Sequence, residues 1–269
     1  MDSKDTFTLD GWALILGASS GIGGACSIEL ARRGMNIFGV HLDRKATVPN
    51  AERIRSEITG MGREAVFYNV NAADPDKRRE VLDEVGKILS ARSGSIRLFL
   101  HSLAFGTLRP LVSTDFKEAI TQAQVEMTLD VMANSFIYWV QDLVARKLMG
   151  RGGRVMAMTS AGGQRAWPIY GAVSAAKAAL ESYIRQLALE LGPLGITANA
   201  IRAGVTDTPA LRKIPGHEKM IDLASTKNPG GRMTTPQDVA RAVALLCHEG
   251  SQWMTGNVIG VDGGEFIVD

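Results

Sequence analysis

The stretch Leu14-Ile15-Leu16-Gly17-Ala18-Ser19-Ser20-Gly21-Ile22-Gly23 decides the fold. A short apolar run ends at the first glycine, and apolar residues at helical spacing continue from Ile22 to Ala31. The pattern predicts a strand, a tight turn and a helix, with glycine where a side chain would obstruct close approach of the backbone to a phosphate. The start of that helix offers unpaired N–H groups and the positive end of its dipole to an anion.

On both sides of this turn the rest of the chain alternates between strand and helix patterns. We expect strands at 12–16, 35–40, 64–70, 96–100, 154–159, 195–201 and 257–261, helices at 51–61, 78–89, 170–191 and 235–248, and two helices within 116–149. Such alternation favours right-handed crossovers and a parallel sheet. The sequence therefore predicts one α/β domain over 1–269, a Rossmann-like doubly wound parallel sheet with helices on both faces. The segment 203–233, rich in glycine and proline, is interpreted as a substrate lid.

Composition excludes several classes of protein. Hydrophobic residues make up 45% and charged residues 22% of the 269, a balance typical of a globular domain. The 30 basic and 28 acidic residues are interspersed, so no nucleic-acid partner is expected. Cys26 and Cys247 lie in apolar helical patterns without paired spacing, which predicts reduced core residues and no metal site. The start of the chain lacks a signal-peptide pattern and no run of about 18 apolar residues occurs, so we expect a cytoplasmic protein without a membrane partner.

The glycine spacing Gly-x-x-x-Gly-x-Gly resembles that of the short-chain dehydrogenase/reductase family. The resemblance covers nearly the whole chain, through a Tyr and a Lys on one helix to the terminal Val261-Asp262-Gly263-Gly264. It implies a nicotinamide dinucleotide bound at the carboxyl ends of the strands. The residues that it implies as cofactor contacts are Gly17, Ser19, Ser20, Gly21, Ile22, Gly23, Arg44, Asn69, Val70, Ser102, Leu103, Ala104, Tyr170, Lys177, Thr206 and Thr208.

The choice of cofactor depends on the end of the second strand, Val40-His41-Leu42-Asp43-Arg44-Lys45. In dinucleotide folds an acid at this place binds the ribose 2′-hydroxyl, whereas a base accepts a 2′-phosphate. The acid of the NAD-preferring relatives aligns with His41, so Asp43 comes two residues late. Arg44 and Lys45 favour NADPH over NADH, while Ser20, where many NADPH-using relatives carry a base, favours the opposite; a solvated charge pair is the other interpretation.

Tyr170 and Lys177 are the candidate catalytic pair. They are seven residues apart, close to two helical turns, so both side chains fall on one face of the helix. Most family members place the Tyr four residues before the Lys, at the position of Val173 here, which cannot donate a hydrogen bond. Proline at 168 suits a helix start, so Tyr170 is expected at the helix entrance. A neighbouring ammonium favours the phenolate, so we expect Lys177 to lower the pKa of Tyr170.

This spacing resembles the enoyl-acyl-carrier-protein reductases of the family, in particular the NADPH-using, triclosan-tolerant type. Three departures point the same way: His101-Ser102-Leu103-Ala104 replaces the usual Asn-Asn-Ala-Gly, Asp130 replaces a catalytic Asn, and Ala203-Gly204 replaces Pro-Gly. Ser160 stands where some enoyl reductases carry a second Tyr and where ketone-reducing relatives carry their catalytic Ser. It is the third candidate catalytic residue.

The resemblance implies an enoyl-acyl-carrier-protein reductase of fatty-acid synthesis. The alternatives are an NAD(P)H-dependent carbonyl reductase of 3-ketoacyl groups or hydroxysteroids and, from another class, a non-catalytic nicotinamide-binding sensor. An acidic carrier protein would meet Arg212, Lys213 and Lys219, and the acyl chain would lie beside Leu211, Ile214, Met220, Ile221 and Leu223. Family members usually pair the 170–191 helix in homotetramers, and the small residues of this helix permit such a contact.

Overall fold

The structure is a computed structural model that describes residues 7–268. Seven strands form one sheet in the order β3-β2-β1-β4-β5-β6-β7, and every neighbouring pair is parallel. The strands are β1 (Trp12–Leu16), β2 (Asn36–His41), β3 (Ala65–Asn69), β4 (Ile96–His101), β5 (Arg154–Ser160), β6 (Thr197–Ala203) and β7 (Val258–Val261). The predicted doubly wound α/β fold is confirmed.

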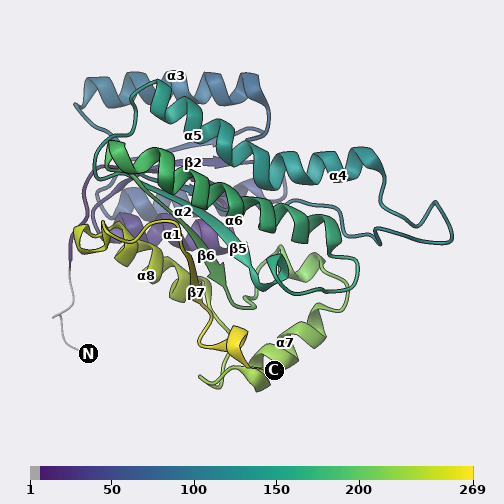
Figure 1. Ribbon diagram of the computed structural model, residues 1–269. Coiled ribbons are helices and arrows are strands. Elements are labelled where there is room, and N and C mark those ends of the chain that lie inside the picture. Colours follow the sequence, from purple (N-terminus) through teal and green to yellow (C-terminus); the bar gives the residue numbers. More distant parts are fainter. Residues whose placement is uncertain (1–6, 269) are drawn as a thin grey trace.

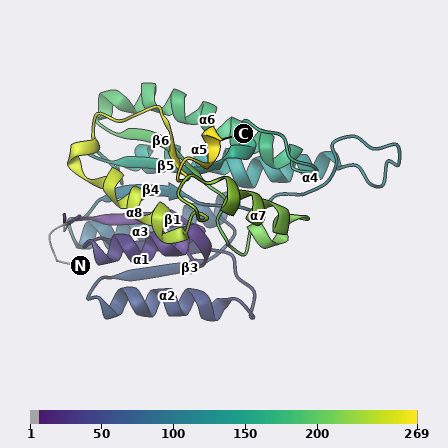
Figure 2. The same ribbon diagram turned by 90° about the horizontal axis from the view of Figure 1, so that it is seen from below.

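Helices cover both faces of the sheet (Figures 1 and 2). One face is covered by α1 (Gly21–Arg32), α2 (Val48–Gly60) and α8 (Pro236–Cys247), and the other by α3 (Pro75–Ala91), α5 (Ser135–Ala145) and α6 (Gly171–Leu191). Alternate residues of each strand face opposite layers, so Leu14 and Leu16 join one core while Ala13 and Ile15 join the other. Cys26 and Cys247 are buried free thiols, and burial raises the pKa of both.

The ends of α8 show how local sequence sets an element. Thr235 is the N-cap, and its hydroxyl accepts from the backbone N–H of Asp238, whose side chain in turn accepts from the Thr235 backbone. Pro236 occupies the first turn, where no backbone donor is needed. At the other end, the buried Arg154 donates to the carbonyls of Leu246 and His248, satisfying acceptors that the helix leaves unpaired.

Two segments differ from the sequence prediction. Within 116–149, helix begins only at α4 (Gln122–Leu129), and a π-helical turn, Asp130–Asn134, joins it to α5. The residues before α4 form an extension that projects from the body of the molecule (Figures 1 and 2). The expected irregular lid, 203–233, contains a short 3₁₀ turn at Leu211–Lys213 and the helix α7 (His217–Lys227).

The carboxyl ends of the parallel strands meet at one edge of the sheet. The chain order reverses between β2 and β4, on either side of β1, and such a switch point is where dinucleotides bind in doubly wound folds. Leu16, His101, Ser160 and Ala203 end their strands at this edge. No helix within residues 7–268 is long and apolar enough to cross a bilayer.

Candidate active site

The turn after β1 fits a pyrophosphate. Gly17 has φ +86°, and a Cβ there would overlap the carbonyl oxygen of Ser102; a Cβ on Gly23 would overlap the carbonyl oxygen of Gly17. Ser20 is the N-cap of α1 and makes no side-chain cap hydrogen bond, so first-turn N–H groups remain for an anion. The Thr208 methyl lies 3.3 Å from where a Cβ on Gly21 would stand. These residues form a cradle of backbone donors that a nicotinamide dinucleotide would occupy.

The end of β2 is held by Asn69, the last residue of β3, at the place where the resemblance implies the adenosine half of a cofactor. Its side chain accepts from the Asp43 backbone N–H at 2.8 Å and donates to the Asp43 carbonyl at 3.0 Å. The resemblance implies that Asn69 is a cofactor contact, and in this structure its side chain fixes the end of β2. Val70 is tied to the same place, because its N–H donates to the carbonyl of His41.

Asp43 presents an ionised carboxylate at this end. Its Oδ2 lies 2.7 Å from Nδ1 of His41. Burial acts to raise the Asp43 pKa, but the hydroxyls of Ser19 and Thr47 and the ring of His41 outweigh it, so the pKa falls below its ordinary value. Arg44, by contrast, has an exposed side chain, as does the next residue, Lys45.

Tyr170 is the N-cap of α6, at the helix entrance that the sequence predicted. Ile169 before it has φ +59°, a strained value for a β-branched residue and one that turns the chain sharply into the helix. The Tyr170 ring and the Ser160 hydroxyl both adjoin Gly162, where a Cβ would overlap the ring and stand 3.3 Å from the hydroxyl oxygen. Ser160 Oγ is buried without a hydrogen-bond partner among residues 7–268. Tyr170 and Ser160 thus place a hydroxyl group where it can donate a hydrogen bond to a substrate oxygen.

The predicted lowering of the Tyr170 pKa is wrong. Burial raises that pKa, and interaction with the Ser160 hydroxyl opposes the rise only in part. The ammonium of Lys177 does not donate to the phenol here: it donates to the carbonyl of Met158 at 2.7 Å. Tyr170 is therefore a neutral phenol, able to donate a proton in a hydrogen bond.

Lys177 is buried, with 5% of its surface exposed. Burial lowers its pKa to about 8, and Glu181 acts in the opposite direction. Sequence analysis missed Glu181, although its position one turn after Lys177 was a usable signal. The Glu181 carboxylate is held by Thr159, which donates at 2.7 Å, and by Gln164, which donates at 3.2 Å.

His101 lies fully buried at the end of β4. Ser135 donates its hydroxyl proton to the carbonyl of Val131, so the 2.9 Å contact between His101 Nε2 and Ser135 Oγ requires His101 to donate. Burial, aided by the charge of Lys177, lowers the His101 pKa to about 3. The ring is thus a neutral, fixed part of the site floor and not an acid–base group.

The usual position of the family's Tyr is closed. Val173 is buried beneath Gly106, where a Cβ would stand 2.8 Å from Val173 Cγ2. Asp130, which replaces a catalytic Asn, is the first residue of the π-helical turn. Tyr170, at the N-cap, is the phenol that adjoins Ser160, because the hydroxyl of Tyr183, further along the same helix, donates to Asn134.

The loop after β6 reaches back over the turn. The Thr206 hydroxyl donates to the carbonyl of Gly204 at 2.8 Å. The backbone of Thr206 also pairs with that of Thr234, at the far end of the lid, in an isolated parallel β-bridge. The expected carrier-protein patch is smaller than predicted, because Asp207 binds the Arg212 guanidinium through two contacts of 2.7 Å. The other two residues of that patch, Lys213 and Lys219, are exposed.

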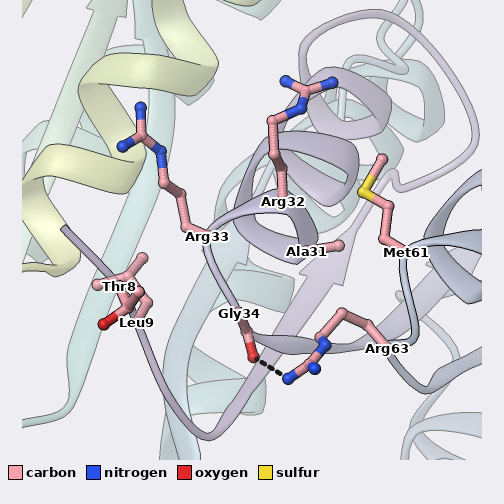
Figure 3. A pocket seen from close by; sticks show the side chains of 8 residues that line it. All are labelled: Thr8, Leu9, Ala31, Arg32, Arg33, Gly34, Met61 and Arg63. Atoms are coloured by element: carbon pink, nitrogen blue, oxygen red, sulfur yellow. Dashed lines mark hydrogen bonds between the residues drawn. The ribbon is translucent and has the colours of Figure 1, made fainter. Parts of the chain in front are cut away.

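Two pockets lie away from the candidate catalytic residues. One, of about 410 Å³, touches the phosphate turn at Ser20 and Gly21 and extends between α1, α2 and α8. The other, of about 390 Å³, lies at the opposite edge of the sheet, where Arg63 donates to the carbonyl of Gly34 (Figure 3). Neither pocket contains Tyr170 or Lys177. Within residues 7–268 no cluster of His, Cys, Asp and Glu could hold a metal.

A glycine cradle at the switch point, together with a half-buried Tyr at the N-cap of α6 and a buried Lys on the same helix, defines an oxidoreductase that uses NAD(P)H. The family model described as enoyl-(acyl carrier protein) reductase matches residues 17–265. The chain therefore belongs to the short-chain dehydrogenase/reductase family.

Three similar proteins illustrate the range of that family. A 1-cyclohexenylcarbonyl-CoA reductase of Streptomyces collinus is 29% identical, over 95% of this chain and 87% of its own length. An NADPH-dependent aldehyde reductase-like chloroplastic protein of Arabidopsis thaliana is 29% identical, over 94% of this chain and 93% of its own. The crystal structure of an NADH-using enoyl-[acyl-carrier-protein] reductase of Aquifex aeolicus VF5 is 26% identical, with a TM-score of 0.80 and 96% of each chain covered. Enoyl and carbonyl reductases both lie within this range.

Proposed function

We propose that the protein is an enoyl thioester reductase of fatty-acid synthesis, acting on trans-2-enoyl groups carried by acyl carrier protein. The proposal rests on one observation: Tyr170, the phenol that adjoins Ser160, stands at the N-cap of α6, three residues before the position that Val173 closes. Three residues correspond to about 4.5 Å along a helix.

That displacement suits an enoyl substrate better than a ketone. In a ketone the carbon that receives hydride carries the oxygen itself. In an enoyl thioester the hydride goes to the β-carbon, and the negative charge develops on an oxygen two carbons away. A phenol set back along the helix is therefore placed for the thioester oxygen.

The chain's own residues bind and polarise the substrate. The bound nicotinamide supplies the hydride. Tyr170 donates a hydrogen bond to the thioester oxygen and stabilises the enolate charge as it develops. Lys177, whose pKa of about 8 leaves it mainly charged at neutral pH, contributes positive potential beneath the site. A solvent proton then reaches the α-carbon, giving the saturated thioester and the oxidised nicotinamide.

A carbonyl reductase is the second candidate, and the placement of Ser160 favours it. The unpartnered Ser160 hydroxyl adjoins Tyr170, so two hydroxyls converge where a ketone oxygen could bind. The name of the Arabidopsis relative, an aldehyde reductase-like protein, is in line with this candidate.

For the cofactor we propose NADPH. The charge of Asp43 is already dispersed over His41, Ser19 and Thr47, whereas the exposed bases next to it are free to turn toward a 2′-phosphate. We also propose a homotetramer that pairs α6, since the outer face of this helix carries small exposed residues (Ala175, Ala178 and Ser182) and the exposed Leu189.

The test is oxidation of NADPH and of NADH with crotonyl and acetoacetyl thioesters, measured in parallel. We expect turnover of the crotonyl thioester to exceed that of the acetoacetyl thioester, with NADPH the better donor. Preference for the acetoacetyl thioester would replace the enoyl proposal with the carbonyl one. Tight cofactor binding with no turnover of either would indicate a sensor.

A further inference from the structure

The C-terminal turn, Asp262–Phe266, follows β7 and contacts both ends of the lid 203–233. Gly263 and Gly264 have φ of +61° and +90°, which bend the chain back toward the catalytic edge. In Figure 1 the yellow end of the chain lies at the same lower edge of the molecule as α7.

Glu265 binds the start of the lid. Its carboxylate accepts from the Val205 N–H with both oxygens, at 3.0 and 3.3 Å. The contact needs a glycine beside it, because a Cβ on Gly204 would stand 2.8 Å from Glu265 Oε2. Val205 directly precedes Thr206, one of the expected cofactor contacts.

Asn228 ties the other end of the lid to the same turn. It is 5% exposed and donates to the Asp262 carbonyl at 2.7 Å, while its own side-chain oxygen accepts from the Gly230 N–H at 2.8 Å. The two ends of the lid are thus bound by residues only three positions apart.

The turn is also linked to the loop that precedes Tyr170. Arg165 of that loop donates to the Phe266 carbonyl and stacks on its ring at 4.5 Å, and Arg202 of β6 stacks on the ring at 3.7 Å. The charged groups that face Glu265 are Arg165 and Asp262, and Asp262 itself lies 3.7 Å from Arg202.

We propose that the C-terminal turn is a clasp that fixes both ends of the lid, and that Glu265 is the positioning residue that holds Val205, and with it the cofactor-contacting backbone, in place. The inference rests on the proposed cofactor contacts of Thr206 and Thr208. Glu265 touches the loop and not the reacting atoms, so it acts on cofactor binding and lid closure.

The state of the carboxylate adds a pH signature. Burial raises the Glu265 pKa above its ordinary value; the Val205 N–H opposes the rise and the charge of Asp262 adds to it. Acidification therefore protonates Glu265 earlier than an exposed carboxyl, and the protonated group is a weaker acceptor for Val205.

The experiment compares Glu265→Ala, Glu265→Gln and, as a charge-matched control on the exposed surface, Glu249→Ala. Binding of NADPH and of NADH is measured by calorimetric titration, and trypsin cleavage at the lid lysines Lys213, Lys219 and Lys227 is followed with and without cofactor. We expect the Ala variant to bind about tenfold more weakly and to lose the cofactor's protection of the lid, because a charge-assisted hydrogen bond is removed. The Gln variant, which keeps a neutral acceptor, stays within about threefold of wild type, and the control matches wild type.

The Gln variant, which keeps the size of the side chain, also provides a test that still holds if the Ala variant fails to fold. As pH falls, we expect wild-type affinity to weaken and that of Glu265→Gln to change less, because only the wild type carries at position 265 a carboxylate that can be protonated. Equal affinity, equal pH dependence and equal lid protection in wild type and variants would overturn the clasp alone. A wild type that binds neither nucleotide would overturn the proposed function and the clasp together.

Discussion

Glu181 lies one helical turn after Lys177 on the buried face of α6, and both side chains are more than nine-tenths buried. Its carboxylate is fixed by Thr159 and Gln164, so its charge cannot move away from the ammonium. The ammonium itself is held by the carbonyl of Met158. Burial and Glu181 therefore act in opposite directions on the charge of Lys177, and burial prevails.

The first prediction concerns this balance. With a pKa of about 8, Lys177 carries its charge below that pH and loses it above, so kcat/KM should fall as pH rises through about 8. Glu181→Gln removes the opposing charge and lowers the Lys177 pKa further. The fall in kcat/KM should then move to lower pH by about one unit, measured as a pH–rate profile.

The control is Glu190→Gln, which changes an exposed carboxylate on the same helix. Its profile should superimpose on that of the wild type. An unshifted profile in Glu181→Gln, with the protein folded, would show that Glu181 has only a packing role.

The second prediction concerns Tyr170. Tyr170→Phe keeps the ring against Gly162 but removes the donor, so kcat should fall about 10²–10³-fold, equivalent to about 2.7–4 kcal/mol, by analogy with the loss of an oxyanion-hole donor. The dissociation constant of NADPH should stay unchanged. Full turnover in this variant would remove the phenol from the chemistry.

Ser160→Ala provides the comparison that separates the two candidate reactions. An enoyl reductase that relies on Tyr170 should lose less than about tenfold in kcat, because Ser160 adjoins the phenol and Tyr170 alone donates to the thioester oxygen. A loss as large as that in Tyr170→Phe would favour a carbonyl substrate bound by both hydroxyls.

Local sequence was sufficient to predict the sheet, the tight turn between β1 and α1, and the place of Tyr170. The glycine at position 17 and the apolar periodicity can be seen in a short stretch of sequence. Once the strands are parallel, their carboxyl ends meet at one edge of the sheet, whatever the connections between them. The π-helical turn escaped prediction because it changes the hydrogen-bond register by one residue without altering the apolar pattern. The helix α7 was missed because glycine and proline surround a short amphipathic segment.

The contacts that tune the site could not be predicted in the same way. The Lys177 ammonium binds a backbone carbonyl, a group that every residue carries, so no residue type signals it. Asn69 binds Asp43 across 26 positions and Glu265 binds Val205 across 60. Such pairs are set by the tertiary arrangement alone.

The third prediction tests the cofactor proposal. Asp43→Asn removes a negative charge beside Ser19, so NADPH should bind about tenfold more tightly relative to NADH than in the wild type, because repulsion of the 2′-phosphate is relieved. Arg44→Ala should change the ratio the other way. The measurement is the ratio of the two dissociation constants at constant salt, and Arg55→Ala, an exposed residue of α2, is the control. An unchanged ratio in both Asp43→Asn and Arg44→Ala would place the selecting group elsewhere.

The fourth prediction concerns the geometry of the phosphate turn. In Gly23→Ala the new methyl would overlap the carbonyl oxygen of Gly17, and because both groups belong to the backbone, the turn has to open. We expect the free energy of unfolding to fall by about 1–3 kcal/mol and the cofactor to bind at least about tenfold more weakly, since the first-turn N–H groups lose their convergence. Gly60→Ala is the matched control: nothing lies within 4 Å of its new methyl, and at the end of α2 alanine should raise stability by up to about 1 kcal/mol. Denaturant unfolding and cofactor titration of the two variants decide the matter. If Gly23→Ala bound NADPH like the wild type, the cradle would not be the phosphate site, because a turn opened by a methyl group cannot keep its donors aimed at one anion.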